Sequence, residues 1–267
     1  MNIKDDIRKY LPKNYPNLEY GGHPIRLLDL ANHTSGLPNS MRSFPSTIQD
    51  SLRKLSLTEQ VNFYALYKQD KMLADLHQIK LDTLLGVQYR YNSNGMTILI
   101  LLLERIYKQD YGQLITNYLK KDFGIFDTKP ELSLTEIKRA AQGYDRKNQP
   151  QEFANLKGFL MGPSMNSTTN DMVKFIEANL SEKNKAIKLT HQLTLGKKHG
   201  FGLGWMLDTE SNGERYIYDD GNTKLGYNTL CTLYPGKNTG FIIMVNDNIS
   251  QEKVGELENA IRRNLSK

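Results

Sequence analysis

Apolar residues recur at helical spacing along most of the first 200 residues. One stretch is apolar on nearly every side, which is typical of a helix at the centre of a domain. Its apolar members include Ile98, Leu99, Leu102, Leu103 and Ile106. Ser56 and Glu59 form a capping-box pattern, which predicts a helix from there to about residue 72. Ser167 or Thr168 is expected to cap another helix. The buried stripe of that helix would be Met172, Phe175, Ile176 and Leu180.

The pattern changes to short alternating runs after about residue 200. Four strands are predicted, over residues 202–207, 214–218, 227–234 and 239–245. Asn-Gly at residues 212–213 and Pro-Gly at 235–236 indicate tight turns, so the strands are expected to form an antiparallel meander. A final helix is expected from about Ser250, with an apolar stripe that packs on one face of the sheet. This stripe consists of Val254, Leu257, Ile261 and Leu265.

Helices followed by adjacent strands predict an α+β fold rather than a parallel doubly wound sheet. We expect one domain over residues 1–267, with a mainly helical lobe over about 13–200 and a sheet with its terminal helix over about 200–267. The longest apolar run, residues 96–103, is shorter than the roughly 18–20 residues that cross a bilayer. The first residues contain no apolar signal-peptide core, so no signal peptide is predicted and the localisation stays undetermined.

Composition and charge narrow the function classes. The chain is 39% apolar and 24% charged, as in a globular protein. Its 35 basic and 29 acidic residues give a net charge of +6, but the basic residues are scattered, so nucleic-acid binding is not predicted. The five histidines show no metal-ligand spacing and no phosphate-binding glycine loop is present, so neither a metal nor a cofactor is expected. The single cysteine, Cys231, lies in an apolar run and is expected to be buried.

Tyr91 and Ser93 are the first candidates for chemistry. They lie two residues apart at the start of the apolar helix, where a phenol and a hydroxyl can point the same way. Nearby cations would lower the pKa of the phenol and make it a general base. The alternative is a tyrosine that packs and hydrogen-bonds at the helix start, which is the more common role of an isolated Tyr-x-Ser pair.

Three stretches, in this order, resemble the serine β-lactamase and penicillin-binding protein family, in its class C and esterase branch. They are His-Thr-Ser-Gly-Leu-Pro at residues 33–38, Tyr-Arg-Tyr-Asn-Ser-Asn at 89–94 and Asp-Asp-Gly-Asn-Thr at 219–223. Further stretches resemble the family in the same order, namely residues 4–12, 118–128, 141–144, 167–172 and 200–205. The resemblance implies the β-lactamase/transpeptidase-like fold, in which a terminal helix packs on an antiparallel sheet beside a mostly helical lobe.

The resemblance also implies acyl transfer, in which a serine attacks an amide or ester and water then hydrolyses the acyl-enzyme. The substrate would be a peptide, a β-lactam or a small ester. Tyr91 falls at the family's catalytic tyrosine, and Ser93 falls where the family usually has asparagine. A backbone N–H near Thr223 would belong to the oxyanion hole. Members of the family are often periplasmic or secreted. The substrate-binding edge of the pocket would consist of Asp219, Gly221, Asn222 and Thr223.

Two departures from the family pattern bear on activity. The family needs a Ser-x-x-Lys nucleophile before its first motif, yet none of the 32 residues before His33 is a serine. Asp219 stands where the family has a cation, so it would repel a substrate carboxylate and raise the pKa of Tyr91. Lys224 is near enough in sequence to compensate. Alternatively, residues 219–223 are a polar turn between strands with no role in the site.

Other serines fit the nucleophile position poorly. Ser51 with Lys54, and Ser250 with Lys253, match Ser-x-x-Lys but lie at the wrong place relative to the other motifs. Ser250 is more simply a helix cap. Ser35 belongs to a turn that the family uses as scaffold.

Three functions are therefore compatible with the sequence, and the sequence does not decide whether the chain is an enzyme. The first is a β-lactamase-related serine hydrolase domain that lacks the N-terminal segment with the nucleophile and is inactive alone. The second is a non-catalytic binding or regulatory module on the same fold, which the charge inversion at Asp219 favours. The third is a hydrolase that uses Ser51 and Lys54. Without the family's N-terminal strands a sheet edge would be exposed, so we expect a homo-oligomer or a partner chain over that edge, besides a small-molecule or peptide substrate.

Overall fold

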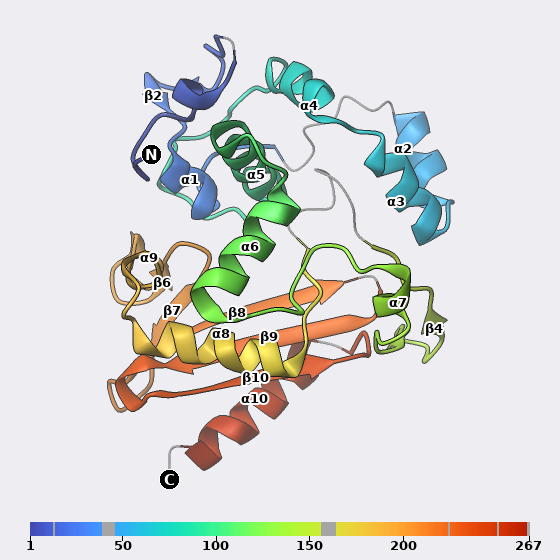
Figure 1. Ribbon diagram of the computed structural model, residues 1–267. Helices are drawn as coiled ribbons and strands as arrows, with labels where there is room; N and C mark the ends of the chain where they lie inside the picture. The colour runs from blue at the N-terminus through green and yellow to red at the C-terminus, as the bar shows by residue number, and fades with distance from the viewer. Residues whose placement is uncertain (13, 39–45, 156–163, 224, 250, 266–267) are drawn as a thin grey trace.

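The computed structural model describes residues 1–12, 14–38, 46–155, 164–223, 225–249 and 251–265 (Figure 1). Most of the helices lie in the upper part of the view, and the main sheet and the C-terminal helix lie in the lower part. Among the helices of these residues, none combines the length and the apolar character that a membrane crossing would need.

Six antiparallel strands form the main sheet, in the order β10-β9-β8-β7-β6-β5. Each strand pairs with its neighbours in sequence, which confirms the antiparallel sheet and the α+β fold. The strands are β5 (Leu195–Gly196), β6 (Gly200–Phe201), β7 (Met206–Thr209), β8 (Arg215–Thr223), β9 (Tyr227–Tyr234) and β10 (Thr239–Val245). Two short hairpins stand apart from this sheet, and they consist of β1 (Glu19–Tyr20), β2 (His23–Pro24), β3 (Gly143–Tyr144) and β4 (Pro150–Gln151).

A helix packs on each face of the sheet. On one face Ile176 of α8 (Thr169–Ser181) contacts Ile217 and its strand neighbours, and on the other Val254 of α10 (Gln251–Leu265) contacts Leu230 and Ile243. Alternate residues of a strand point to opposite faces, so β8 and β9 each contribute to both cores. The predicted stripe of α10 is only partly right, because Leu257 is 46% exposed. The side chain of Leu265 lies outside the described residues.

The helical part is built around α5 (Ser93–Tyr107), which confirms the predicted central helix. Ile98, Leu101 and Leu102 of this helix are completely buried. Ile106 is exposed, because the last turn of the helix extends beyond this core. The other helices are η1 (Ile7–Tyr10), α1 (Leu27–Ala31), α2 (Ser46–Arg53), α3 (Leu57–Ala65), α4 (Gln69–Leu76), α6 (Tyr111–Phe123), α7 (Leu134–Ile137), α9 (Lys185–Thr190) and η2 (Pro235–Lys237).

The helix predicted over about residues 56–72 is wrong in one respect, because the chain forms two helices there, α3 and α4. The capping box itself is present, since Ser56 and Glu59 bond each other's backbone N–H groups at 2.8 and 3.2 Å. The break between the helices brings Tyr67 into the core, where its hydroxyl donates to Asp75 at 2.7 Å. Burial of a large aromatic side chain with its hydroxyl satisfied favours the break over a continuous helix.

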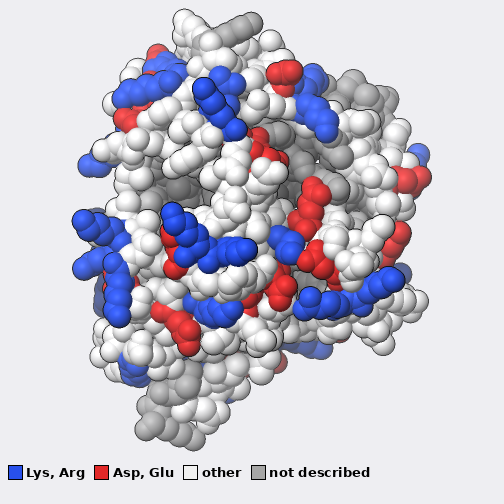
Figure 2. All heavy atoms as spheres, viewed as in Figure 1, with Lys and Arg blue, Asp and Glu red and all other residues white. Residues whose placement is uncertain are grey.

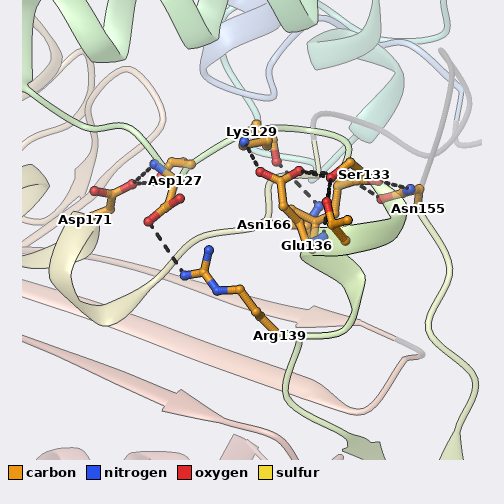
Figure 3. Close-up of polar contacts among 11 residues, drawn as sticks. Asp127, Lys129, Ser133, Glu136, Arg139, Asn155, Asn166 and Asp171 are labelled. Carbon is orange, nitrogen blue, oxygen red and sulfur yellow. Dashed lines mark hydrogen bonds and ion pairs between the residues drawn. The ribbon is translucent and has the colours of Figure 1, made fainter.

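Polar contacts fasten the loop after α6 to the start of α8 (Figure 3). Thr168 caps α8 by accepting the N–H of Asp171 at 3.2 Å. Of the two caps predicted from the sequence, Ser167 and Thr168, the second is therefore correct. Asp171 is 3% exposed, and its carboxylate accepts the N–H of Asp127 at 2.6 Å and the hydroxyl of Thr128 at 3.0 Å. The helix that covers the sheet is thereby tied to the helical part.

Candidate active site

The stretch at residues 33–38 follows α1 and lies against residues 86–94, about fifty residues further along the chain. The carbonyl of Thr34 accepts the N–H of Gly86 at 2.9 Å, and the carbonyl of His33 accepts the N–H of Arg90 at 2.8 Å. Ser35 is 1% exposed, so its hydroxyl is not open to a substrate. The two motifs thus form one framework, in which residues 33–38 support the segment that carries Tyr91.

Asn92 is the main side-chain link in this framework. It caps α5 by accepting the N–H of Asn94 at 2.9 Å. Its own amide donates to the carbonyls of Leu37 and Pro38 at 2.7 and 3.0 Å, and Asn94 donates to Pro38 at 2.9 Å. Because Asn92 is buried, each of these bonds satisfies a polar group that water does not reach.

Tyr91 precedes this cap and presents its ring to solvent. The side chain is 67% exposed, and its ring lies against the imidazole of His33 with 4.7 Å between the ring centroids. Ser93, the first residue of α5, is exposed as well. The structure therefore places the predicted pair together at the open start of the central helix, and not in apolar packing.

Residues 219–223 belong to the long strand β8, so the alternative of a turn between strands is wrong. The turn comes after them, because β8 continues pairing with β9 as far as Thr223 opposite Tyr227. By alternation Asp219, Gly221 and Thr223 share the face of Ile217, which is the face that α8 covers. At Gly221 a Cβ would come to 2.9 Å from the Oγ1 of Thr229, so the strand has no room for a side chain there.

Asn222 lies on the opposite face of β8, and the structure does not bring its side chain to Asp219. Its amide donates to Asn228 at 2.6 Å and to Asn248 at 3.4 Å, which ties the end of β8 to β9 and to the segment after β10. Thr223 is different, because its Oγ1 is buried and has no hydrogen-bond partner among the described residues. Lys224 lies outside the described residues.

Charged residues of β8 affect the pKa of Tyr91. Partial desolvation raises the pKa of Tyr91, and the charges of Asp219 and Asp220 raise it further. Desolvation and the charge of Asp220 raise the pKa of Asp219 itself to about 6. Among the described residues, no lysine or arginine forms an ion pair with either aspartate. The phenol of Tyr91 is therefore protonated near neutral pH, and the strand opposite it is negative.

Three aromatic residues around Tyr91 were not among the predicted site residues. Tyr89 stacks on Phe201 of β6 with 3.9 Å between centroids and 5° between planes, which connects the tyrosine segment to the sheet. The ring of His33 lies between Tyr89 and Tyr91, at 5.8 and 4.7 Å. The alternation of Tyr89 and Tyr91 in an extended segment was a signal that the two rings lie on one side. Phe201 had no such signal, since only the tertiary fold brings it near.

The remaining candidates from the sequence lie elsewhere. Ser51 is on α2 and exposed, as is Lys54 just beyond that helix. Ser250 lies outside the described residues. Cys231 is buried beside Asp219 in the sheet, and burial raises the pKa of its thiol to about 12, so the prediction of a buried thiol is confirmed. On the face that Figure 2 shows, basic and acidic side chains are interspersed.

Comparison with known proteins connects this arrangement to a family. A family model described as beta-lactamase matches residues 1–264. The Staphylococcus aureus (strain MRSA252) protein named "Protein flp" is 23% identical over 259 residues, which cover 93% of this chain and 48% of that protein. The chain thus spans about half the length of the curated relatives of this kind that it matches.

Solved structures share the fold. A beta-lactamase/D-alanine carboxypeptidase from Yersinia pestis, complexed with citrate, has a TM-score of 0.72 at 22% identity, and the match covers 92% of this chain and 71% of that one. An octameric penicillin-binding protein homologue from Pyrococcus abyssi has a TM-score of 0.70 at 16% identity, with 92% of this chain and 56% of that one covered.

Proposed function

The chain belongs to the beta-lactamase family, and from that premise we propose that these 267 residues carry the tyrosine side and the strand side of an acyl-transfer site but do not acylate by themselves. The observation that carries this proposal is the position of Tyr91. Its phenol is exposed, and the segment that carries it reaches the sheet through the stacking of Tyr89 on Phe201 of β6. Desolvation and the charges of Asp219 and Asp220 on β8 raise the pKa of the phenol, which supports two walls of one site.

The proposal of inactivity depends on two groups. No serine precedes His33 within these residues, and Ser35 is buried, so the attacking hydroxyl has no source at the family's position in this stretch. The phenol of Tyr91 is held protonated by its surroundings, so it is not ready to accept a proton at neutral pH. An acyl-enzyme needs both a nucleophile and a base that can take its proton.

A nucleophile supplied from outside these residues would meet a partly built site. If a cation supplied with the nucleophile, such as the lysine of a Ser-x-x-Lys segment, lowered the pKa of Tyr91, its phenolate would take the proton of the serine, with the hydroxyl of Ser93 as its hydrogen-bonding neighbour. A backbone N–H near Thr223 would stabilise the oxyanion of a peptide, β-lactam or small-ester substrate. Asp219 would disfavour substrates with a carboxylate at that edge, because like charges repel at short range.

Covalent labelling tests this proposal. The chain is treated with a fluorescent penicillin and, separately, with a fluorophosphonate, and adducts are sought by gel fluorescence and mass spectrometry. We expect no labelled serine. A stable adduct on any serine of the chain would refute inactivity. An adduct on Ser51 that Ser51→Ala removes would favour the hydrolase that uses Ser51 and Lys54.

The second candidate is a non-catalytic binding or regulatory module, and the negative charge of Asp219 at the family's cation position favours it. Such a module binds its ligand without turnover and prefers one without a carboxylate at the β8 edge. An NMR titration with a D-alanyl-D-alanine dipeptide and with its C-terminal amide separates the two candidates. Saturable shifts at Tyr91 with the amide alone, and no hydrolysis, favour the module. Equal lack of binding by both peptides favours an incomplete enzyme site.

The same proposal includes a second chain that binds the β10 edge of the main sheet. Among the described residues β10 pairs with β9 and with no strand on its other side, and its seven residues contain neither a charge nor a proline. Natural edge strands usually carry such residues as protection against pairing with other chains. The Pyrococcus abyssi homologue is octameric, which supports a homo-oligomer. A partner chain that adds a strand to β10 is the other form of this proposal.

A further inference from the structure

His33 touches three consecutive residues of the tyrosine segment through three different groups. Its carbonyl accepts the N–H of Arg90 at 2.8 Å. Its imidazole ring lies against the ring of Tyr91, with centroids 4.7 Å apart and planes inclined by 43°. Its Nδ1 lies 3.2 Å from the backbone nitrogen of Asn92. One residue from the 33–38 turn thus contacts the residue before Tyr91, Tyr91 itself and the residue after it.

The protonation of His33 fits this arrangement. Burial lowers the pKa of the imidazole, so the ring is neutral near pH 7. Nδ1 lies 3.2 Å from the backbone nitrogen of Asn92 and 3.1 Å from its carbonyl oxygen, so a neutral ring accepts the N–H in one tautomer and donates to the carbonyl in the other. The ring orientation is therefore set by a hydrogen bond to the segment that it supports.

The backbone of His33 is held in an uncommon conformation, with φ at 56° in the left-handed region. A side chain with a Cβ avoids this region unless its surroundings enforce it. This conformation at the end of α1 turns the imidazole toward Tyr91, and a right-handed residue at the same point would aim its side chain elsewhere.

The position of the Tyr91 ring depends on the contact with His33 more than the position of the Tyr89 ring does. Tyr89 is stacked on Phe201 and so has a second support on the sheet. Tyr91 is 67% exposed, and among the described residues the imidazole of His33 is the aromatic ring against which it packs. Without that ring, Tyr91 can rotate about its Cα–Cβ bond into solvent at little cost.

We propose that His33 is a positioning residue that holds the phenol of Tyr91 in one direction at the open start of α5. The functional meaning rests on the function proposed above, in which Tyr91 faces the reacting group. The contact between the segments does not depend on the imidazole, because Asn92 and Asn94 bond Leu37 and Pro38 independently of it. The role of the ring is therefore to set the direction of Tyr91.

His33→Asn is the most informative variant. Asparagine adopts the left-handed conformation more readily than most residues, and its side-chain oxygen can accept an N–H, but it has no ring. His77→Asn is the matched control, because His77 stacks on Tyr15 at 4.0 Å and its loss removes a histidine–tyrosine contact elsewhere. His33→Gly is a second variant that accepts the backbone conformation without strain.

The readout is the Tyr91 ring itself, observed by NMR with tyrosine labelling and assigned with Tyr91→Phe. In the His33 variants we expect the Tyr91 signals to move to the positions of a freely rotating tyrosine. We also expect the pKa of the Tyr91 phenol to fall toward its ordinary value of 10, because the ring regains solvent and is less affected by the charges of Asp219 and Asp220. His77→Asn should change neither quantity.

Unchanged Tyr91 signals and an unchanged titration in a folded His33→Asn or His33→Gly variant would overturn the positioning role. A purely structural role would lower the melting temperature and leave the Tyr91 titration of the folded protein as it was. Neither measurement uses acylation or a substrate. Failure of the labelling experiment described above therefore leaves this test intact, and the reverse is also true.

Discussion

Asp219 is the residue at which the charge of this site differs from the family pattern, because the family has a cation there. It lies on β8 in register with Cys231, on the face that also carries Ile217 and α8. Its charge contributes to the raised pKa of Tyr91, of Tyr89 and of the Cys231 thiol. Desolvation raises the pKa of Tyr91 most, and Asp219 adds to it where a cation would have lowered it, so this side chain moves Tyr91 further from acting as a base.

The free energy of unfolding of the chain should depend on whether Asp219 is ionised. Its pKa is about 6 in the folded chain against an ordinary 3.8, so the folded state binds the proton more tightly. The free energy of unfolding therefore falls as the pH rises through the window from about 4 to about 6. We predict that Asp219→Asn is more stable than the parent chain by about 1 kcal/mol at about pH 7.5, a value already reduced for solvent screening at an exposed carboxyl.

Urea unfolding at a series of pH values checks this prediction. The gain should disappear at about pH 4, where Asp219 of the parent chain is protonated in the folded state. Asp70→Asn, at an exposed position on α4, is the control and should show no such pH-dependent gain. A gain of Asp219→Asn that is the same at both pH values would contradict the linkage.

At the scale of elements, the contact between the helical part and the sheet is made by helix ends and loops. The start of α8 binds the loop after α6 through Asp171, and the segment before α5 reaches β6 through Tyr89 and Phe201. Both contacts lie at the beginning of a helix, where free N–H groups favour acidic and hydrogen-bonding side chains.

Asp171→Asn should weaken the first of these contacts. The asparagine keeps the shape of the side chain but loses its charge and replaces one acceptor oxygen by a donor that faces other N–H groups. We expect a loss of about 2 kcal/mol in the free energy of unfolding, because the group is buried and accepts from three donors of the loop. Thermal and urea unfolding measure it. The control is Glu177→Gln, at an exposed position of the same helix, which should change the free energy of unfolding by less than about 0.5 kcal/mol. Equal losses in both variants would exclude a specific role of Asp171.

At the scale of the whole molecule, the sheet ends in the edge strand β10, which pairs with β9. β10 is apolar along its length, α8 contacts its face, and the edge away from β9 has no strand beside it among the described residues. Exposed backbone N–H and C=O groups on such an edge favour pairing with another chain.

Association should therefore depend on β10. We predict that the chain sediments as an oligomer at micromolar concentration and that Met244→Lys, which adds a charge to an exposed position of β10, lowers the association. Leu134→Lys on α7 replaces an apolar side chain that is more exposed than Met244, 83% against 39%, and lies far from β10 in sequence, so it should have no effect. A parent chain that remains monomeric over this concentration range would count against both the oligomer and the open edge as its cause.

The local elements were largely predictable from the sequence. The turns at residues 212–213 and 235–236, the apolar character of α5 and the cap of α8 depend on residues close together in the chain, so their patterns are visible without the fold. The predicted helix over residues 56–72 failed where a long-range contact, burial of Tyr67 against Asp75, outweighed a continuous local pattern.

The order of residue types along the chain determined the α+β class, the antiparallel meander and the pairing of Tyr91 with Ser93 at the start of a helix. Only the tertiary structure decided that residues 219–223 are strand, that Asp219 and Asn222 lie on opposite faces of that strand, and that His33 and Phe201 lie near the tyrosine segment. The physical reason is that periodicity reports the environment of a residue relative to its neighbours in sequence. The direction of a charge or a ring toward a distant segment depends on strand register and on contacts that no local pattern encodes.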